Sequence, residues 1–421
     1  MKNSNQGRGT PYVRPIQRVE LSESNVKIRM ILIVVLLAIA SVSIVVGLSS
    51  TLKTEPDWQR VEAQAKKINC SADFILNYDF TDAGSEASSR FKALTNLYSE
   101  ACEDAYRIFT LDMTGGETAN MHDLNRHPNE TVTVDPALYH ALSLVQKYQN
   151  RGLYLAPVYV EYDHIFKAET EVEAASYDPV QNPELVSDLA LLASYANDPD
   201  MIDIQLLGSN QVKLVVAEEY LSFIKSCEIE KLIDFGWMKN AFIADFLAQV
   251  LLDNGFTDGY LVSFDGFTRN LDTRGNTYSF NVFNRQGSDI YNPAVMTYAA
   301  PASIVFLRDY PMTQSDAWQY YAFPNGRIAN MLIDPADGMN KASVDSLVSY
   351  GKQQGCAEVL LQMIPVFIAD EFASSAVQTL TGEGIHSVWC EGQSLCYTDE
   401  QLQIELQPQE DLTYVVKYVG Y

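Results

Sequence analysis

The sequence predicts one composite α/β (α+β) domain, with mixed sheets and packed helices, that follows a single N-terminal transmembrane helix. Residues 30–48 carry no charged side chain. Beyond them, strand-like and helix-like hydrophobic periodicities alternate along the chain. With 47% hydrophobic residues in 421, the chain can bury a sizeable core.

The N-terminal segment predicts a membrane anchor. Nineteen uncharged residues are about the length that crosses a bilayer core as a helix. Residues 1–29 form a basic tail with six Lys or Arg and two Glu, which places the N-terminus in the cytoplasm. We therefore expect a single-pass cell-membrane protein whose main domain is extracytoplasmic. A cleaved signal peptide is the alternative, but 29 leading residues are long for one and no clear A-x-A site follows.

Charge excludes one class of partner. The net charge is −25, and the tail of residues 1–29 contributes +4, so the remainder carries −29. Binding to phosphate backbones requires clustered Lys and Arg. Nucleic acid is therefore not expected as a partner.

The first half of the domain predicts helices and strands from spacing alone. After a linker, residues 57–67 are expected to form a short helix. Residues 74–80 alternate as a strand does, and residues 86–109 follow the spacing of an amphipathic helix. A second amphipathic helix is expected over 136–149, with Asp135 as its cap and proline at its first position.

The stretch of residues 166–183 is acidic and is expected to be a surface excursion. A helix over 183–196 and a hairpin over 202–216 follow it. The central unit, 231–267, predicts strand, turn, helix, turn and strand, and its helix covers 238–253.

The C-terminal part predicts the remaining elements. Helices are expected over 355–370, where Pro365 would end the helix early, and over 372–380. The expected strands, chosen for their β-rich composition, are 278–283, 303–307, 387–396 and 412–419.

Six cysteines are present, without a C-x-x-C pair. In an oxidising compartment Cys390 and Cys396 could bridge a hairpin-like loop. The alternative is that most of the cysteines are buried free thiols.

One motif in the central unit resembles a known family. Its residues read Asp234-Phe-Gly-Trp-Met-Lys-Asn-Ala-Phe-Ile-Ala-Asp245. This is similar to the D-L-G-G-I-A-K-G-Y-A-V-D signature of the FAD:protein FMN transferases, the ApbE family. Asp234, Gly236 and Asp245 match, whereas Trp237 and Asn240 replace a Gly and the Lys. The resemblance implies an ApbE-like domain over residues 70–400, with 401–421 as a C-terminal strand and tail.

Other positions that bind flavin in the family are altered here. Asp112 stands where the family has a flavin-contacting Tyr, and Tyr154-Leu155 where it has Phe-Asp. Asn330 with Met331 replaces a His pair. The resemblance implies this cofactor-binding set: Asp112, Tyr154, Leu155, Asp234, Trp237, Asn240 and Asn330.

The family's magnesium helix carries an Asp and a Thr four residues apart, so both oxygens face one ion. Here Glu358 and Gln362 stand at these positions, with oxygens on longer stems. Together with Ile233 they form the implied Mg²⁺ site.

The resemblance implies transfer of FMN from FAD, which is the substrate, to a Thr or Ser of an extracytoplasmic target protein, with Mg²⁺ neutralising charge. Because several motif positions are altered together, we assign no catalytic residue and expect weak or lost activity. The alternative is a non-catalytic scaffold or assembly domain that binds flavin or a partner protein.

Overall fold

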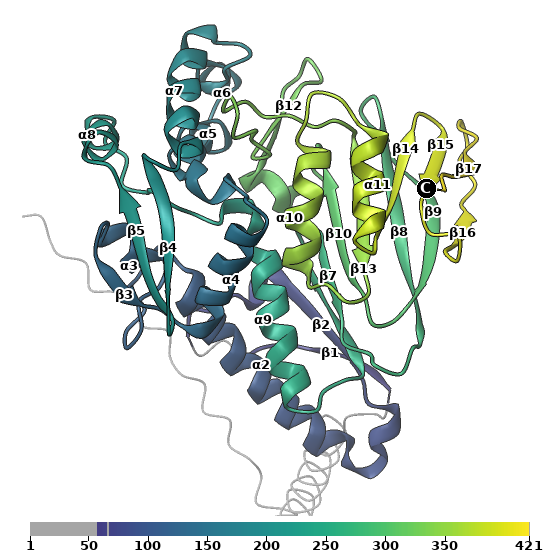
Figure 1. Cartoon of the computed structure of the whole chain (residues 1–421). Coiled ribbons are helices and arrows are strands. Elements are labelled where there is room, and N and C mark those ends of the chain that lie inside the picture. Colours follow the sequence, from purple (N-terminus) through teal and green to yellow (C-terminus); the bar gives the residue numbers. More distant parts are fainter. Residues whose placement is uncertain (1–56, 65–66, 421) are drawn as a thin grey trace, which may run out of the picture. The chain divides into compact units, whose positions relative to one another are not determined.

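A nine-stranded sheet organises the structure, a computed structural model that describes residues 57–64 and 67–420 (Figure 1). Its strand order is β1-β2-β6-β7-β10-β13-β14-β15-β17. All neighbours in it are antiparallel except β15 and β17. The strands are β1 Trp58–Val61, β2 Phe74–Asp79, β6 Gly259–Ser263, β7 Phe267–Asn270, β10 Ser303–Arg308, β13 Ser346–Gly351, β14 Ile385–Glu391, β15 Ser394–Tyr397 and β17 Val415–Tyr418.

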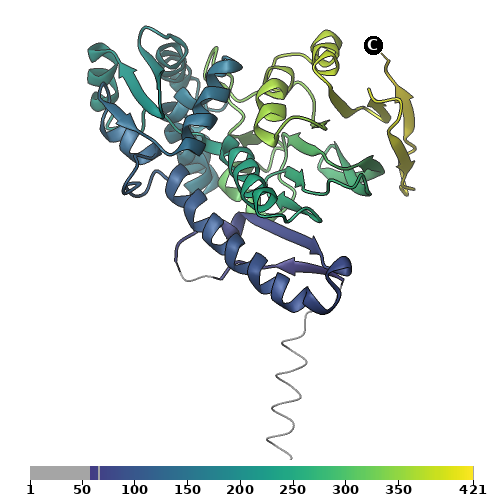
Figure 2. The ribbon, with the colours of Figure 1, turned by 60° about the horizontal axis from the view of Figure 1, so that its bottom comes forward.

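Helices cover one face of this sheet (Figure 1). They bury a large core between themselves and the strands. The helices are α2 Ala87–Phe109, α4 Pro136–Lys147, α9 Lys239–Asp253, α10 Cys356–Phe367 and α11 Ser374–Gly382. Figure 2 shows the long helix α2 beside β1 and β2.

The other face of the sheet packs against a second, smaller core. A three-stranded sheet contributes to it, with the order β16-β9-β8. Its strands are β8 Thr277–Gln286, β9 Asp289–Ala299 and β16 Gln403–Leu406. Strand β10 is buried on both faces: Ile304 and Phe306 face the smaller core, Val305 and Leu307 the larger one. This explains its continuous apolar sequence.

A flanking region carries a second three-stranded sheet and four short helices (Figure 1). The strands, in the order β3-β5-β4, are β3 Thr131–Thr133, β5 Gln211–Val216 and β4 Ile202–Gly208. The helices are α5 Ala156–Lys167, α6 Glu171–Tyr177, α7 Val186–Asn197 and α8 Glu218–Ser226. The predicted α/β (α+β) class, the helix 136–149 and the hairpin 202–216 are therefore confirmed.

Two local predictions in the chain are wrong. Residues 57–67 were expected to be helical, but Trp58–Val61 form strand β1, because they pair with β2 and Trp58 packs on Tyr260 and Tyr278. The strand expected directly before Asp234, at the start of the central unit, is also absent from the described residues. Instead, the side chain of Asn125 binds that segment, accepting from the amides of Leu232 and Ile233 and donating to the Ile233 carbonyl.

The acidic stretch 166–183 is also more ordered than the surface excursion that was expected. It contains the end of α5 and all of α6, and Asp178, the residue that follows α6, is fully buried. Asp178 pairs with Arg327, so a carboxylate from this stretch enters the core. Helix α10 continues through Pro365 to Phe367.

Cys390 and Cys396 do not pair. In the β14–β15 ladder, Cys390 lies opposite Leu395 and Cys396 opposite Trp389. Cys390 faces the smaller core and Cys396 the larger one, so the two thiols lie on opposite faces of the sheet. The alternative, buried free thiols, is confirmed for this pair.

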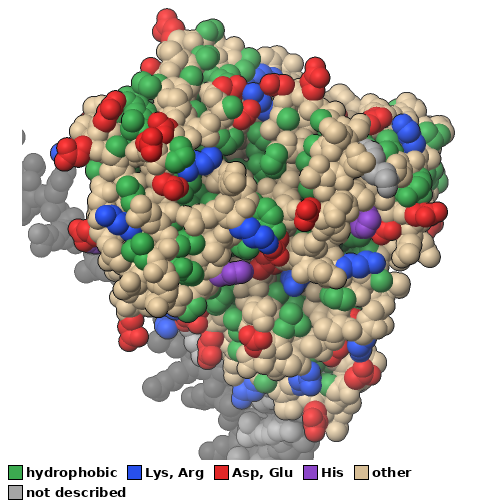
Figure 3. Space-filling view, viewed as in Figure 1, with side chains coloured by type: hydrophobic (Ala, Val, Ile, Leu, Met, Phe, Trp, Pro, Cys, Tyr) green, Lys and Arg blue, Asp and Glu red, His purple; other side chains and the backbone are tan. Residues whose placement is uncertain are grey.

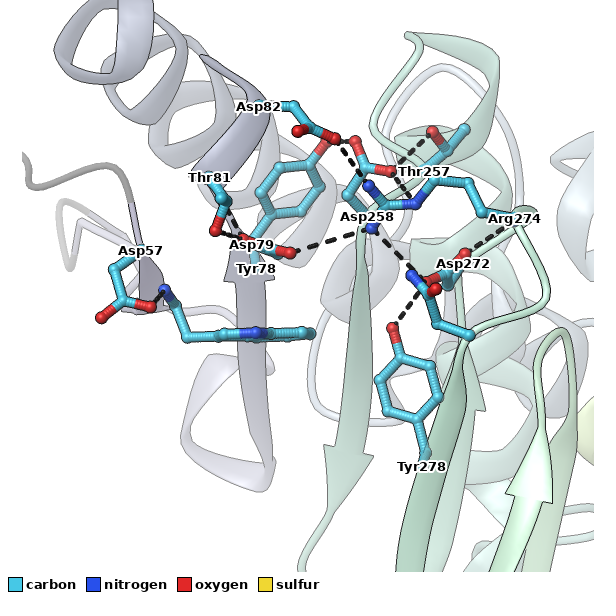
Figure 4. Close-up of polar contacts among 12 residues, drawn as sticks. Asp57, Tyr78, Asp79, Thr81, Asp82, Thr257, Asp258, Asp272, Arg274 and Tyr278 are labelled. Atoms are coloured by element: carbon cyan, nitrogen blue, oxygen red, sulfur yellow. Dashed lines mark hydrogen bonds and ion pairs between the residues drawn. The ribbon is translucent and has the colours of Figure 1, made fainter. Parts of the chain in front are cut away.

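One arginine joins the C-terminal end of β2 to the loop before β8. Arg274 contacts four carboxylates, which Figure 4 shows converging on its guanidinium: Asp79, Asp82, Asp258 and Asp272. Asp272 is fully buried and also accepts hydrogen bonds from Asn276 and Tyr278. Hydrogen bonds from Arg274, Tyr278 and Asn276 outweigh the effect of burial and hold the pKa of Asp272 below its usual value.

The predicted transmembrane segment, residues 30–48, lies outside the described residues. Within the part of the chain that the structure describes, no helix is long and apolar enough to span a membrane.

Candidate functional site

A pocket of about 310 Å³ lies at the start of α9, and we call it the α9 pocket. It forms where the loop before β2, the C-terminal end of α2, helix α5 and the segment leading into α9 meet. Its lining includes polar and aromatic side chains: Asn69, Asp73, Tyr106, Phe109, Asp112, Tyr159, Asp163, Lys231, Asp234, Trp237, Lys239 and Trp318.

The turn into α9 explains why Trp237 faces this pocket. The Asp234 Oδ1 accepts from the Gly236 amide at 2.8 Å, which closes a tight turn. Gly236 has a φ of 54°, and a Cβ atom there would meet the Tyr159 ring at 3.0 Å. Glycine is thus required both for the backbone conformation and for the close approach of Tyr159. The single helical turn Gly236–Met238 then leads directly into α9.

Two tryptophans line the pocket in different environments. Trp237 is 5% exposed, and its indole N–H makes no well-aligned hydrogen bond among the described residues, although it interacts with the Tyr159 hydroxyl. Trp318 is 47% exposed. It lies at the end of a short 3₁₀ turn that is anchored by the buried ion pair Arg308–Asp316, at 3.2 Å. One tryptophan therefore offers a buried donor and the other an exposed ring.

Charges in the pocket are mixed. Burial raises the pKa of Asp234. The ammonium of Lys231 opposes that rise, and its Nζ lies 3.8 Å from Asp234 Oδ2. Burial also raises the pKa of Asp73, and Lys239 opposes it. The lining carries four aspartates, Asp73, Asp112, Asp163 and Asp234, so the two lysines offset the negative charge only in part; they are the pocket groups that could contact a phosphate.

Three residues of the predicted cofactor-binding set line this pocket: Asp112, Asp234 and Trp237. Asp112 accepts hydrogen bonds from the Tyr106 hydroxyl at 3.0 Å and the Thr110 hydroxyl at 3.3 Å. These bonds hold its carboxylate at the pocket rim, next to the end of α2.

The other four predicted residues lie in the interior with partners of their own. Asn240 donates to Asp265 at 2.9 Å. The Tyr154 hydroxyl donates to Asp203 at 2.9 Å, and Leu155 is fully buried. Asn330, on strand β12 Ile328–Asn330, accepts from the Leu332 amide. None of these four side chains lines the α9 pocket.

A second pocket of about 300 Å³ lies between α4, α9 and α10, and Phe109 lines both pockets. Figure 3 shows the molecular face hollowed at this junction. Asp245, the final acid of the motif, lines it and caps α10 by accepting from the amides of Cys356 at 2.7 Å and Ala357 at 2.9 Å. Burial raises the pKa of Asp245, and Arg269 opposes that rise.

The predicted magnesium ligands are engaged by protein groups. Glu358 Oε1 receives hydrogen bonds from Lys147 Nζ at 2.9 Å and the Tyr148 hydroxyl at 3.1 Å. Burial raises the pKa of Glu358, but these donors outweigh it and leave the pKa below the usual value. The Gln362 side-chain amide donates to the Tyr148 hydroxyl, and the Asn125 side-chain amide donates to the Ile233 carbonyl. Magnesium requires free oxygens and is repelled by a neighbouring ammonium, so this donor set does not fit the ion. Among residues 57–64 and 67–420, no cluster of three or more His, Cys, Asp or Glu is arranged to hold a metal.

The pocket also contains residues that the sequence did not single out: Asp73, Asp163, Lys231, Lys239 and Trp318. The sequence does contain a signal for Lys239, because this residue stands one place before the position of the family's Lys. The sequence contains no such signal for Trp318, since a separate loop carries it 79 positions after Lys239.

No protein-family profile and no curated protein matches this sequence. Solved structures do match its fold. The ApbE protein from Thermotoga maritima has a TM-score of 0.57 and 12% identity, over 83% of this chain and 97% of its own. The flavin transferase ApbE from Vibrio cholerae has a TM-score of 0.50, with the same identity and coverage. The chain has an ApbE-like fold.

Proposed function

From this shared fold we propose that the chain is an ApbE-like protein that binds a flavin nucleotide in the α9 pocket, and that FMN transfer is weak or lost. The observation that carries the proposal is the pocket itself. At the motif that resembles the ApbE signature, it combines an exposed Trp318 ring, a Trp237 N–H without a well-aligned acceptor, and two cations, Lys231 and Lys239, among four aspartates. A flavin nucleotide has a planar ring with acceptor atoms and a phosphate, which these groups complement.

The proposal that FMN transfer is weak or lost rests on the environment of Glu358. A transferase of this type needs a cation to neutralise phosphoryl charge. Here the Lys147 ammonium contacts the carboxylate that would hold such a cation. We therefore favour a non-catalytic flavin-binding or assembly role, with an extracytoplasmic protein as partner.

Magnesium-dependent FMN transfer from FAD to a Thr or Ser of such a partner is the second candidate. The retained Asp245 favours it, because this motif acid fixes the N-terminus of α10, the helix that carries Glu358. Membrane attachment through residues 30–48 is part of both proposals and rests on the sequence pattern. Fractionation of the full chain, followed by protease accessibility of the intact membrane, tests it.

Flavin titration separates the two candidates. Residues 55–421 form one compact unit and are suitable for it. FAD and FMN are added with and without Mg²⁺, and flavin fluorescence is followed. Binding in the micromolar range that does not depend on Mg²⁺ is expected. Mg²⁺-dependent binding, together with covalent FMN on a partner, would instead favour the transferase. No binding up to on the order of 100 μM would overturn the flavin proposal.

A pair of variants locates the site. Trp237→Phe keeps an aromatic ring but removes the indole N–H donor, so FAD affinity is expected to fall several-fold. Trp389→Phe is the matched control, because its indole N–H already donates to Glu391 at 3.1 Å and it lines neither pocket. Equal effects of the two changes would place flavin elsewhere.

A further inference from the structure

We propose that Cys70 and Cys102 are a dithiol that forms an intramolecular disulfide when the protein meets a disulfide oxidant. The bond would join a wall of the α9 pocket to helix α2. This inference does not depend on flavin binding.

The backbone brings these two cysteines together. The Cys70 amide donates to the Cys102 carbonyl at 3.3 Å, although the residues lie 32 positions apart. A direct N–H···O bond leaves the two Cα atoms roughly 5–7 Å apart, which overlaps the range found in disulfides. Cys70 precedes β2, and Cys102 lies inside α2.

Both side chains enter the same core, where Cys70 is 5% exposed and Cys102 is fully buried. A hydrogen bond to the Cys102 thiol is the main cause that raises the pKa of Cys70, and burial adds to the rise. The two thiols therefore interact with each other within this core.

The remaining cysteines lack such an arrangement. Cys390 and Cys396 face opposite sides of the sheet, as their register shows. The Cys356 thiol donates to the Thr268 carbonyl at 3.4 Å, and Cys227 is exposed.

Access is provided by the α9 pocket, because Cys70 is part of its lining. Because Cys70 is only 5% exposed, exchange at its sulfur from the pocket side requires a local opening of the loop that carries it. The raised pKa keeps the thiolate fraction low, so exchange in the folded protein is expected to be slow, and the buried bond, once formed, is protected from reductants.

The reaction balances as two thiol–disulfide exchanges. The Cys70 thiolate attacks one sulfur of oxidised glutathione, breaks its S–S bond and releases one glutathione thiolate. The Cys102 thiolate then attacks Cys70 Sγ in this mixed disulfide and releases the second glutathione. The protein loses two electrons and two protons, and both reach the two glutathione molecules as thiols.

The bond would connect two walls of the α9 pocket. Residues 69–73 supply Asn69 and Asp73, and α2 supplies Tyr106 and Phe109. A crosslink between these segments restricts the unfolded chain and is expected to raise the melting temperature by several degrees.

The test counts thiols in the full chain carrying Cys227→Ser, which leaves five cysteines and no exposed thiol. The protein is equilibrated with oxidised glutathione, denatured and alkylated, and its mass and linked peptides are determined. Three alkylated thiols and a peptide joining Cys70 to Cys102 are expected.

Two further variants make the result specific. Adding Cys102→Ser leaves four cysteines, all of which should be alkylated or carry glutathione, with no rise in melting temperature. Adding Cys396→Ser also leaves four, but only two should be alkylated and the linked peptide should remain. Five alkylated thiols in the parent protein, or a link between other cysteines, would overturn the proposal.

Discussion

The side-chain amide of Asn240 donates to Oδ2 of Asp265 at 2.9 Å, and neither residue's Oδ1 has a hydrogen-bond partner among the residues described. The pair joins the start of α9 to the turn after β6. Burial raises the pKa of Asp265 to about 6, and the nearby Ser263 hydroxyl and the Asn240 amide offset only part of that rise. A carboxylate next to an unpaired amide oxygen is therefore buried between the start of α9 and the turn after β6.

Replacing this carboxylate should stabilise the protein at neutral pH. The ordinary pKa is 3.8 and the folded value is about 6, so the folded state binds more protons between these pH values. The free energy of unfolding therefore falls as pH rises from about 4 to 6. Asp265→Asn removes the buried charge and supplies a donor for Asn240 Oδ1. We expect a gain of about 1–2 kcal/mol at pH 7.5 and little change near pH 4.

Urea unfolding at a series of pH values measures this effect. Asp289→Asn, at an exposed position of β9, is the matched control for the change in net charge. If both variants shifted stability equally, the buried charge would not be the cause.

The Asp178–Arg327 pair should contribute strongly to stability. Asp178 is fully buried and also accepts from the Val180 amide and the Gln181 side chain. Asp178→Ala leaves the largely buried Arg327 without its partner, so unfolding free energy should fall by about 3–5 kcal/mol. Asp163→Ala removes a pair with the exposed Lys167 and should cost below about 1 kcal/mol. Thermal or urea unfolding distinguishes them, and a small loss for both would refute the role of Asp178.

Glu358 should not act as a magnesium ligand. Because Lys147 and Tyr148 occupy its carboxylate, Glu358→Gln is expected to leave FAD affinity unchanged both with and without Mg²⁺. Stability should fall by about 0.5–1 kcal/mol, since the Lys147 partner is half-exposed. Calorimetric titration of the variant with FAD gives the affinity. A variant that lost only the Mg²⁺-dependent part of binding would restore the transferase interpretation.

Trp318 should contribute to binding through its exposed ring. Trp318→Leu removes a stacking surface worth about 1–1.5 kcal/mol, so the Kd for FAD should rise about tenfold and the quenching of flavin fluorescence should decrease. Trp58→Leu is a suitable control, because Trp58 is similarly exposed but packs on Tyr260 and Tyr278, away from the pocket lining. Equal Kd values for Trp318→Leu and the unmodified protein would exclude stacking there.

Patterns within short segments predicted much of the fold. The alternation of residues 74–80 and the spacing of 86–109 correspond to β2 and α2, and Asp135 caps α4 by accepting from the Ala137 amide. These features depend on residues a few positions apart, so the sequence carries them directly. The turn of Asp234 and Gly236, and with it the place of Trp237 in the candidate site, is local in the same way.

Contacts between distant segments were not predictable in that way. Residues 58–61 form a strand because β2 offers a free edge, and Asp178 is buried because Arg327 reaches it from 149 positions away. The pairing of Glu358 with Lys147 and the approach of Cys70 to Cys102 have the same origin. Charge neutralisation and burial depend on which side chains meet in three dimensions, whereas periodicity records only the face on which each side chain lies. The chain's own residues thus specify helices, strands and turns, and the packing between those elements determines which groups are available for chemistry.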